Sequence, residues 1–240
     1  NKHYNRRIKI MSGIVGSKLN IRGSGLVGSL GTDGQHLLSA GAGKTNVFET
    51  AAGGYWNLIK SITASSSGTV DFVNGASDVV FDSTYKQYMI RMINVHPQTN
   101  GADFGFNASA DTGSNYNVVK MVGAYATYHR ENDANEAGIQ YRGTEDSTQS
   151  TAAQEIFPEQ EGTDNDSGGS GEIIFYDPSN TTFVKHFISH SSHFQWDTPP
   201  YAKFNSFGGY FNTTSAVDAI QFAYTSGNID SGQFILYGAT

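Results

Sequence analysis

Three histidines near the C-terminal end of the sequence are the first candidates for chemistry. His186, His190 and His193 could hold a metal ion if the nearby carboxylate of Asp197 completed the site. In an extended strand, side chains alternate between the two faces, so His186 and His190 would share a face that His193 does not. We therefore interpret them as surface or hydrogen-bonded histidines and predict no metal site.

Acidic residues suggest a second kind of metal chemistry. Asp164, Asp166 and Glu172 could serve a calcium ion, but their spacing does not fit the twelve-residue calcium loop, in which Glu172 would come too early. We interpret them as part of an acidic, solvated loop. The run from Asp111 to Asn115 predicts an Asx-type turn.

Catalytic patterns give no further candidate. Many carboxylate pairs could face a sugar, but none is singled out, and there is no nucleophile-elbow pattern and no cysteine. The run Gly41-Ala42-Gly43-Lys44-Thr45 lacks the first glycine of a phosphate-binding loop. The sequence therefore predicts a protein that is not an enzyme and needs no cofactor.

Aromatic residues crowd the region from 196 to 211. Exposed aromatic rings can stack on sugars, which gives four candidate glycan-binding residues, namely Trp196, Tyr201, Phe207 and Tyr210. In the alternative interpretation, alternate members of this run fill a hydrophobic core.

The composition favours short strands joined by tight turns. The 240 residues include 28 Gly, 13 Tyr and 15 Phe, and only 15 % are charged, which argues against a helical bundle. No apolar run is long enough for a membrane span, and the basic residues are too scattered to predict nucleic-acid binding.

Charge and glycine divide the chain into two parts. Residues 1–54 contain seven Lys or Arg and two Asp or Glu, a net charge of +5, whereas the rest of the chain totals −12. Residues 11–54 also contain eleven Gly. We predict an extended, basic, Gly-rich arm at 1–54, in which 1–10 is an extension before Met11, and a body at 55–240. The expected contacts of the arm with a neighbouring subunit or shell involve Lys18, Arg22, Leu26, Leu37 and Leu38.

Period-two alternation in the body predicts strands. The expected strands lie at 56–64, 69–73, 79–81, 85–95, 104–106, 116–129, 139–141, 172–176, 183–189 and 204–211, followed by a closing hairpin within 216–237. The strand at 85–95 is nearly all apolar and should be central, and Gly123 is a candidate bulge. Residues 172–176 and 183–189 should pair across Asp177-Pro178-Ser179-Asn180, and 143–170 should form a long exposed loop. The predicted fold is an all-β, antiparallel two-sheet sandwich of the jelly-roll kind.

A short stretch of the arm resembles a motif common in bacteriophage fibres and other virion appendages. Thr32-Asp33-Gly34 and Gly41-Ala42-Gly43 would form its two turns, and Val47-Phe48 would supply its aromatic position. The resemblance covers about 18 residues. It implies a trimer.

The body resembles an uncharacterised β domain of structural proteins from marine tailed bacteriophages. The segments that carry this resemblance include Ile93-Asn94-Val95-His96-Pro97, Asp177-Pro178-Ser179-Asn180-Thr181-Thr182 and Ser226-Gly227-Asn228-Ile229-Asp230-Ser231-Gly232. It spans roughly residues 56–238 and implies a virion component without known catalysis, placed among other virion proteins such as a major capsid protein or tail proteins. The expected function is a homotrimeric capsid-decorating, cement or head-fibre protein. The alternative is a tail-fibre or surface module that recognises a host glycan.

Overall fold

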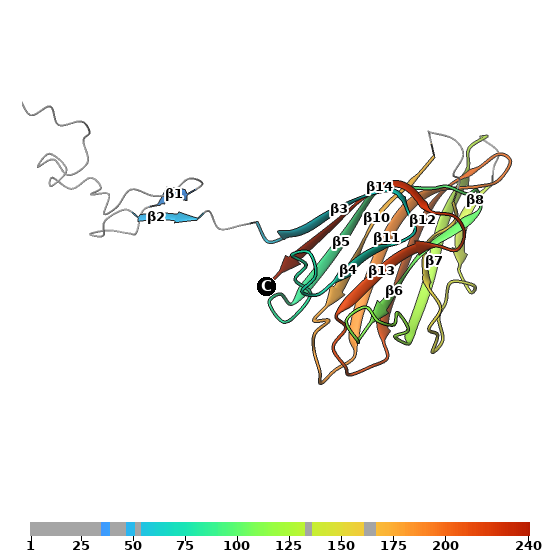
Figure 1. Ribbon diagram of the computed structural model, residues 1–240. Coiled ribbons are helices and arrows are strands. Elements are labelled where there is room, and N and C mark those ends of the chain that lie inside the picture. The colour runs from blue at the N-terminus through green and yellow to red at the C-terminus, as the bar shows by residue number, and fades with distance from the viewer. Residues whose placement is uncertain (1–34, 39–46, 51–53, 133–135, 161–166) are drawn as a thin grey trace, which may run out of the picture. The chain divides into compact units, whose positions relative to one another are not determined.

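The computed structural model describes residues 35–38, 47–50, 54–132, 136–160 and 167–240. The chain divides into two compact units, residues 1–54 and residues 55–240. In the first unit, β1 (Gln35–Leu38) pairs antiparallel with β2 (Val47–Thr50), and Leu37 lies opposite Phe48 (Figure 1). Residues 1–10 and the predicted contact residues Lys18, Arg22 and Leu26 lie outside the described residues, as do the side chains of Leu37 and Leu38.

In the second unit, every regular element among the described residues is a β-strand. The strands are β3 (Asn57–Ser67), β4 (Val70–Val73), β5 (Gln87–Pro97), β6 (Ala102–Ser109), β7 (Lys120–Arg130), β8 (Ala137–Tyr141), β9 (Gln154–Gln160), β10 (Gly169–Tyr176), β11 (Lys185–Gln195), β12 (Tyr201–Phe211), β13 (Ala219–Tyr224) and β14 (Ile229–Ala239). No helix long and apolar enough to cross a membrane occurs in the described part of the chain. The prediction of an all-β, antiparallel fold is confirmed.

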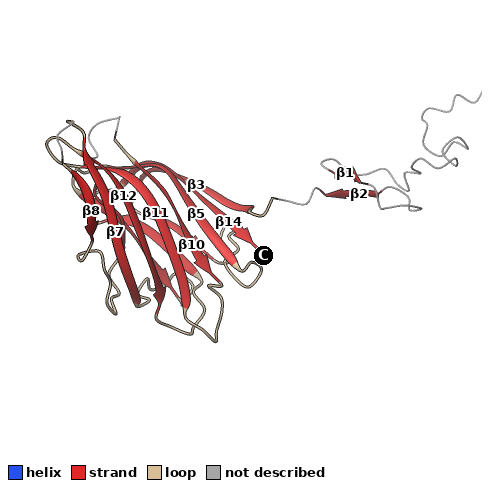
Figure 2. Cartoon of the chain, turned by 180° about the vertical axis from the view of Figure 1, so that it is seen from behind, coloured by secondary structure: helices blue, strands red, loops and turns tan. Residues whose placement is uncertain are grey.

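Hydrogen bonds join these strands into one twelve-stranded sheet that curves into a nearly closed, barrel-like shape (Figures 1 and 2). One row runs β3-β14-β5-β10-β11-β12-β7-β8, and the other runs β4-β13-β6-β9. The rows are connected where Gln195 in β11 pairs with Gln160 in β9. The strand at 85–95 was predicted to be central, and β5 does pair on both sides, with β14 and β10.

Aromatic rings from the two rows meet in a common core. Phe106 in β6 lies 5.5 Å from Phe187 and 5.9 Å from Phe175, measured between ring centroids, and Phe222 in β13 lies 5.5 Å from Phe234 in β14. All these rings are fully buried or nearly so. Burying one such side chain contributes about 1.5–3 kcal/mol, so the inward faces of the two rows dominate the stability of the body.

The predicted closing hairpin is wrong in its pairing. Both strands exist, but β13 pairs with β4 and β6, whereas β14 pairs with β3 and β5. The segment between them crosses from one row to the other, and Gly227 in it has a φ of 71°. Alternation of apolar and polar residues identifies the inward face of each strand but not its hydrogen-bonded neighbours. The same pattern is therefore expected for the two strands of a hairpin and for two strands that face each other across a core.

The predicted exposed loop at 143–170 is also wrong, because it contains β9. The inward positions of β9 include Gln154 and Gln160, which are buried polar residues. Gln160 Nε2 donates to the carbonyl of Val95 at 2.7 Å, and Gln154 Nε2 donates to the carbonyl of Glu145 at 2.9 Å. Because hydrogen bonds satisfy these amides, they can occupy buried positions. The inward positions of β9 are therefore partly polar, and the apolar alternation that would predict a strand is missing.

Three smaller predictions have clear outcomes. The pairing of 172–176 with 183–189 is confirmed as the β10–β11 hairpin. Residues 79–81 form no strand, although Val79 and Phe81 are buried. Gly123 forms no bulge, because β7 and β12 pair in unbroken register with Gly123 opposite Gly208.

Candidate functional site

The structure separates the four aromatic residues predicted to bind a glycan. Trp196 is 50 % exposed in the segment between β11 and β12, and Tyr201 begins β12 at a half-buried position. Phe207 is 4 % exposed and stacks on Phe106 in the core, which matches the alternative interpretation of that run. Tyr210 belongs to the opposite face of β12, beside His186. The four side chains therefore form no single platform.

The histidines alternate as the strand pattern predicts. His186 and His190 are exposed on one face of β11, and His193 is buried on the other. Asp197 pairs with Arg130 at 3.2 Å instead of with a histidine. Among the described residues no group of histidines and carboxylates is arranged to hold a metal ion.

The acidic segments also have defined partners where they are described. The run from Asp111 to Asn115 does turn, since the Ser114 N–H donates to the Asp111 carbonyl at 3.3 Å. The Asp111 side chain, however, accepts from the Asn115 N–H four residues on, at 2.8 Å, instead of two residues on as in an Asx turn. Glu172 pairs with Arg91 at 3.3 Å on an exposed face. Asp164 and Asp166 lie outside the described residues.

A pocket of about 280 Å³ lies where β7, β8, β11 and β12 come together. Its lining comprises Tyr128, Glu136, Gln140, Arg142, Gln195, Tyr201 and Lys203. Strand register places these residues, because Lys203 lies opposite both His193 in β11 and Tyr128 in β7, and Gln195 lies opposite Tyr201. The rings of Tyr128 and Tyr201 meet edge to face with centroids 5.7 Å apart.

The rim of the pocket is held by charged and hydroxyl groups. Arg130 lies over the ring of Tyr201, 4.3 Å from its centroid, and forms an ion pair with Glu136 at 2.6 Å. The Tyr201 hydroxyl donates to Glu136 at 2.5 Å. These contacts fix the orientation of the Tyr201 ring at the entrance.

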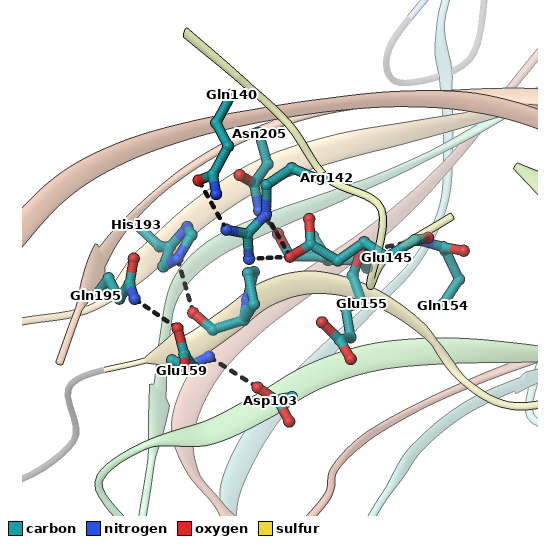
Figure 3. Close-up of polar contacts among 12 residues, drawn as sticks. Asp103, Gln140, Arg142, Glu145, Gln154, Glu155, Glu159, His193, Gln195 and Asn205 are labelled. Carbon is teal, nitrogen blue, oxygen red and sulfur yellow. Dashed lines mark hydrogen bonds and ion pairs between the residues drawn. The ribbon is translucent and has the colours of Figure 1, made fainter. Parts of the chain in front are cut away.

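A buried polar cluster lies against the pocket (Figure 3). Arg142 Nε donates to Glu145 at 2.6 Å, and a second guanidinium nitrogen donates to Gln140 Oε1 at 3.1 Å. Glu145 is almost fully buried, and its backbone carbonyl accepts the hydrogen bond from Gln154. The ion pair therefore neutralises Arg142 inside the protein and leaves little of its charge for a ligand.

Carboxylates gather on the far side of the same cluster. Glu159 accepts a hydrogen bond from Gln195 Nε2 at 2.5 Å, and its backbone N–H donates to Asp103 at 2.8 Å (Figure 3). Burial, together with the charges of Asp103 and Glu145, raises the pKa of Glu155 to about 7. Glu155 does not line the pocket, so its protonation affects stability and does not place an acid beside a ligand.

Several polar atoms here are buried and have no hydrogen-bond partner. They are His193 Nδ1, Gln195 Oε1 and Asn205 Oδ1. His193 Nε2 lies 3.0 Å from the carbonyl of Pro158, and burial lowers the pKa of His193 to about 3. The imidazole is therefore neutral, with its proton on Nε2, which leaves Nδ1 as a free acceptor.

Lys203 is the cation that this arrangement leaves available. Its side chain is 5 % exposed, and burial lowers its pKa. Residue type pointed to Tyr201 but not to Lys203, because lysine is usually a surface residue. The signal was present, since alternation from Tyr201 to Phe207 places Lys203 and Asn205 on the inward face.

A larger cavity of about 570 Å³ lies beside Asn94, His96 and Asp230. Half of its lining residues are Ser or Gly, and Asp230 lies 3.8 Å from the His96 imidazole. The smaller pocket is therefore the better candidate, because it combines aromatic walls, amides and a buried cation.

Comparison with protein-family models, with curated proteins and with solved structures found no match for this chain.

Proposed function

We propose that this chain is a non-enzymatic structural protein of a virus particle, a capsid-decorating, cement or head-fibre protein. The observation that carries the proposal is the strand order. Eight of the strands, β3 to β6, β9, β10, β13 and β14, line up as β3-β14-β5-β10 in one row and β4-β13-β6-β9 in the other. With the rows read as two packed sheets, this is the order of a jelly roll, a fold common in viral capsid and lectin domains.

The remaining strands fit this interpretation as insertions. β7 pairs with β8 and β11 pairs with β12, so each pair is a hairpin between consecutive strands that widens the first row. Fold alone does not determine function, and the resemblance to phage structural proteins supplies the rest of the argument. The body would be the solvent-facing part of a homotrimer within the virion.

The basic arm would supply the attachment. Residues 1–54 carry +5 against −12 for the rest of the chain, and they hold too many glycines to build a core of their own. An arm of this kind would order on a neighbouring subunit, on the major capsid protein or on a tail protein, and would add contacts across subunit boundaries.

Particle attachment tests this proposal directly. Purified full-length chain and a chain lacking residues 11–54 would be mixed with particles and sedimented, and cryo-EM would locate the bound density. We expect the full-length chain to co-sediment and the shortened chain to remain in solution. Equal attachment of both chains would refute the role of the arm, and density confined to tail fibres would favour the second function.

The second candidate function is a tail-fibre or surface module that recognises a host glycan. It is supported by the pocket with its tyrosine walls and by Trp196, which is exposed between β11 and β12. Titration of the chain with host polysaccharide should change tryptophan fluorescence, because a ligand near Tyr201 would alter the surroundings of Trp196. A Trp196→Phe variant controls for the other tryptophan, Trp56.

A further inference from the structure

Lys203 differs from the other buried lysines of the body in having no partner among the residues that the structure describes. No oxygen of the described residues accepts a hydrogen bond from its Nζ or forms an ion pair with it, although the side chain is almost entirely buried. The ammonium is not sealed from solvent, because Lys203 lines the pocket, so water or an anionic ligand must meet its charge there. Two other buried lysines do have partners, since Lys120 donates to Asn107 Oδ1 at 2.6 Å and Lys185 donates to the carbonyl of Thr213 at 2.9 Å.

The carboxylates around Lys203 already have partners. Glu145 holds Arg142, Glu159 accepts from Gln195, and Glu136 pairs with Arg130. Glu145 and Glu159 act on Lys203 only through space. The ammonium therefore lines the pocket as the group best able to receive an anion.

The other lining groups suit a sugar ring. Tyrosine rings offer apolar faces to C–H groups, and the amides of Gln140 and Gln195 offer donors and acceptors to hydroxyl groups. The volume of about 280 Å³ lies just below the range of typical small-molecule pockets, which suits a single monosaccharide unit.

We propose that this pocket binds a hexuronate unit of a polysaccharide, with the sugar carboxylate on Lys203 and the sugar ring against the wall that Tyr128 and Tyr201 form. The proposal rests on the glycan-binding function and adds to it the class of sugar. Neutral hexoses lack the carboxylate and would leave Lys203 without a partner, so they should bind more weakly. A uronate chain, in which each unit carries a carboxylate, would present the preferred ligand in many copies.

Isothermal titration calorimetry on the full chain tests the proposal with four probes: glucuronate, galacturonate, glucose and an oligogalacturonate. We expect both uronates to bind about 10–100-fold more tightly than glucose, the range of one charge-assisted hydrogen bond. The oligogalacturonate should bind at least as tightly as monomeric galacturonate, whereas a site for free sugar acids would exclude the oligomer.

Lys203→Met provides the decisive variant, because it should separate binding from folding. It should weaken uronate binding about 10–100-fold and yet raise the melting temperature, since a largely desolvated ammonium is removed. Lys203→Gln should lose binding in the same way. The matched control is Lys185→Met. Lys185 is a buried lysine at the start of β11, whereas the pocket lies at the end of β11, so this variant should leave uronate binding unchanged.

Three outcomes would overturn the proposal. They are equal affinity for glucose and glucuronate, uronate binding that survives Lys203→Met, and no binding of any probe. If neutral polysaccharide still changes the fluorescence of Trp196 while uronates show no preference, the glycan-binding function stands and only the sugar class is wrong.

Discussion

The two ends of the β11–β12–β7 ladder differ in whether their buried lysines have an oxygen partner. At one end Phe211 lies between Lys185 and Lys120, and each ammonium has an oxygen partner. At the other end Lys203 lies between His193 and Tyr128, and it has no partner among the described residues. Buried polar groups are normally satisfied, and exceptions concentrate at functional sites. The contrast supports the proposal that one end of the ladder serves stability and the other binds a ligand.

The largest expected effect comes from the aromatic residues at the two ends. Phe211→Ala should destabilise the protein by about 3–5 kcal/mol, because it opens a cavity among Phe106, Phe175 and Phe187. Tyr201→Ala should cost about 1 kcal/mol or less, the range for an exposed cation–π contact. Urea unfolding of both variants measures the difference. Equal losses would break the comparison between the two ends.

The buried lysines should give effects of opposite sign. Lys120→Met leaves Asn107 Oδ1 without its donor and should lower the free energy of unfolding by about 1–3 kcal/mol. Lys203→Met should raise it, as argued above. Thermal unfolding of both variants under one buffer condition gives the comparison. If both variants changed stability in the same direction, a partner for Lys203 would have to exist in the free protein.

His193 should make the binding end sensitive to acid. Its folded pKa of about 3 lies below the unfolded value, so the stability it contributes is complete above pH 6.5 and is lost as pH falls toward 3. The loss should reach about 1.4 kcal/mol for each pH unit in this window. His193→Gln should flatten the pH dependence of urea unfolding, whereas the exposed His190→Gln should leave it as in the parent protein. A parent protein with constant stability between pH 6 and pH 4 would contradict the assignment of a neutral, buried imidazole.

Glu155 should give the smallest effect, with the opposite sign. Its folded pKa of about 7 exceeds the ordinary glutamate value of 4.5, so the folded state takes up a proton and loses stability as pH rises from about 4.5 to about 7. Glu155→Gln should raise the melting temperature at pH 8 by about 2–4 °C, equivalent to about 1 kcal/mol for a body of this size. At pH 4 the variant and the parent should melt alike. A gain of equal size at both pH values would indicate better packing instead of relief from a buried charge.

Much of the fold could be predicted from alternation, and the two failures of that prediction have different causes. The pattern revealed β5, the β10–β11 hairpin and the inward face of β12, because apolar residues alternate there with exposed ones. It did not reveal that β13 and β14 separate, since periodicity defines faces and not neighbours. Alternation did not predict β9, because amides occupy some of its inward positions. Burying an amide costs free energy unless tertiary hydrogen bonds satisfy it, and those bonds cannot be read from the sequence.

The candidate site was less predictable than the fold. Exposure and aromatic character pointed to Tyr201, which does line the pocket, but also to Phe207, which fills the core. Lys203 is a candidate binding residue because no described residue pairs with its ammonium group. This property depends on β7, β11 and β12 together, so the sequence around Lys203 does not reveal it. Gln195 and Arg142 likewise gain their roles from contacts with β9 and with Glu145, which lies within the segment predicted to be a loop.

The pairing of β14 between β3 and β5 has a consequence for how the body is made. Asn57 near the start of β3 lies opposite Gly238 near the end of β14, about 180 residues later. During synthesis β3 and β5 would leave the ribosome long before β14, the strand that pairs with both. Until β14 emerges, the edges of β3 and β5 that it covers would remain unpaired. Contacts over such separations form slowly. Nascent chains stalled before β14 should therefore stay protease-sensitive and bind chaperones, and protection should arise abruptly once β14 has left the exit tunnel.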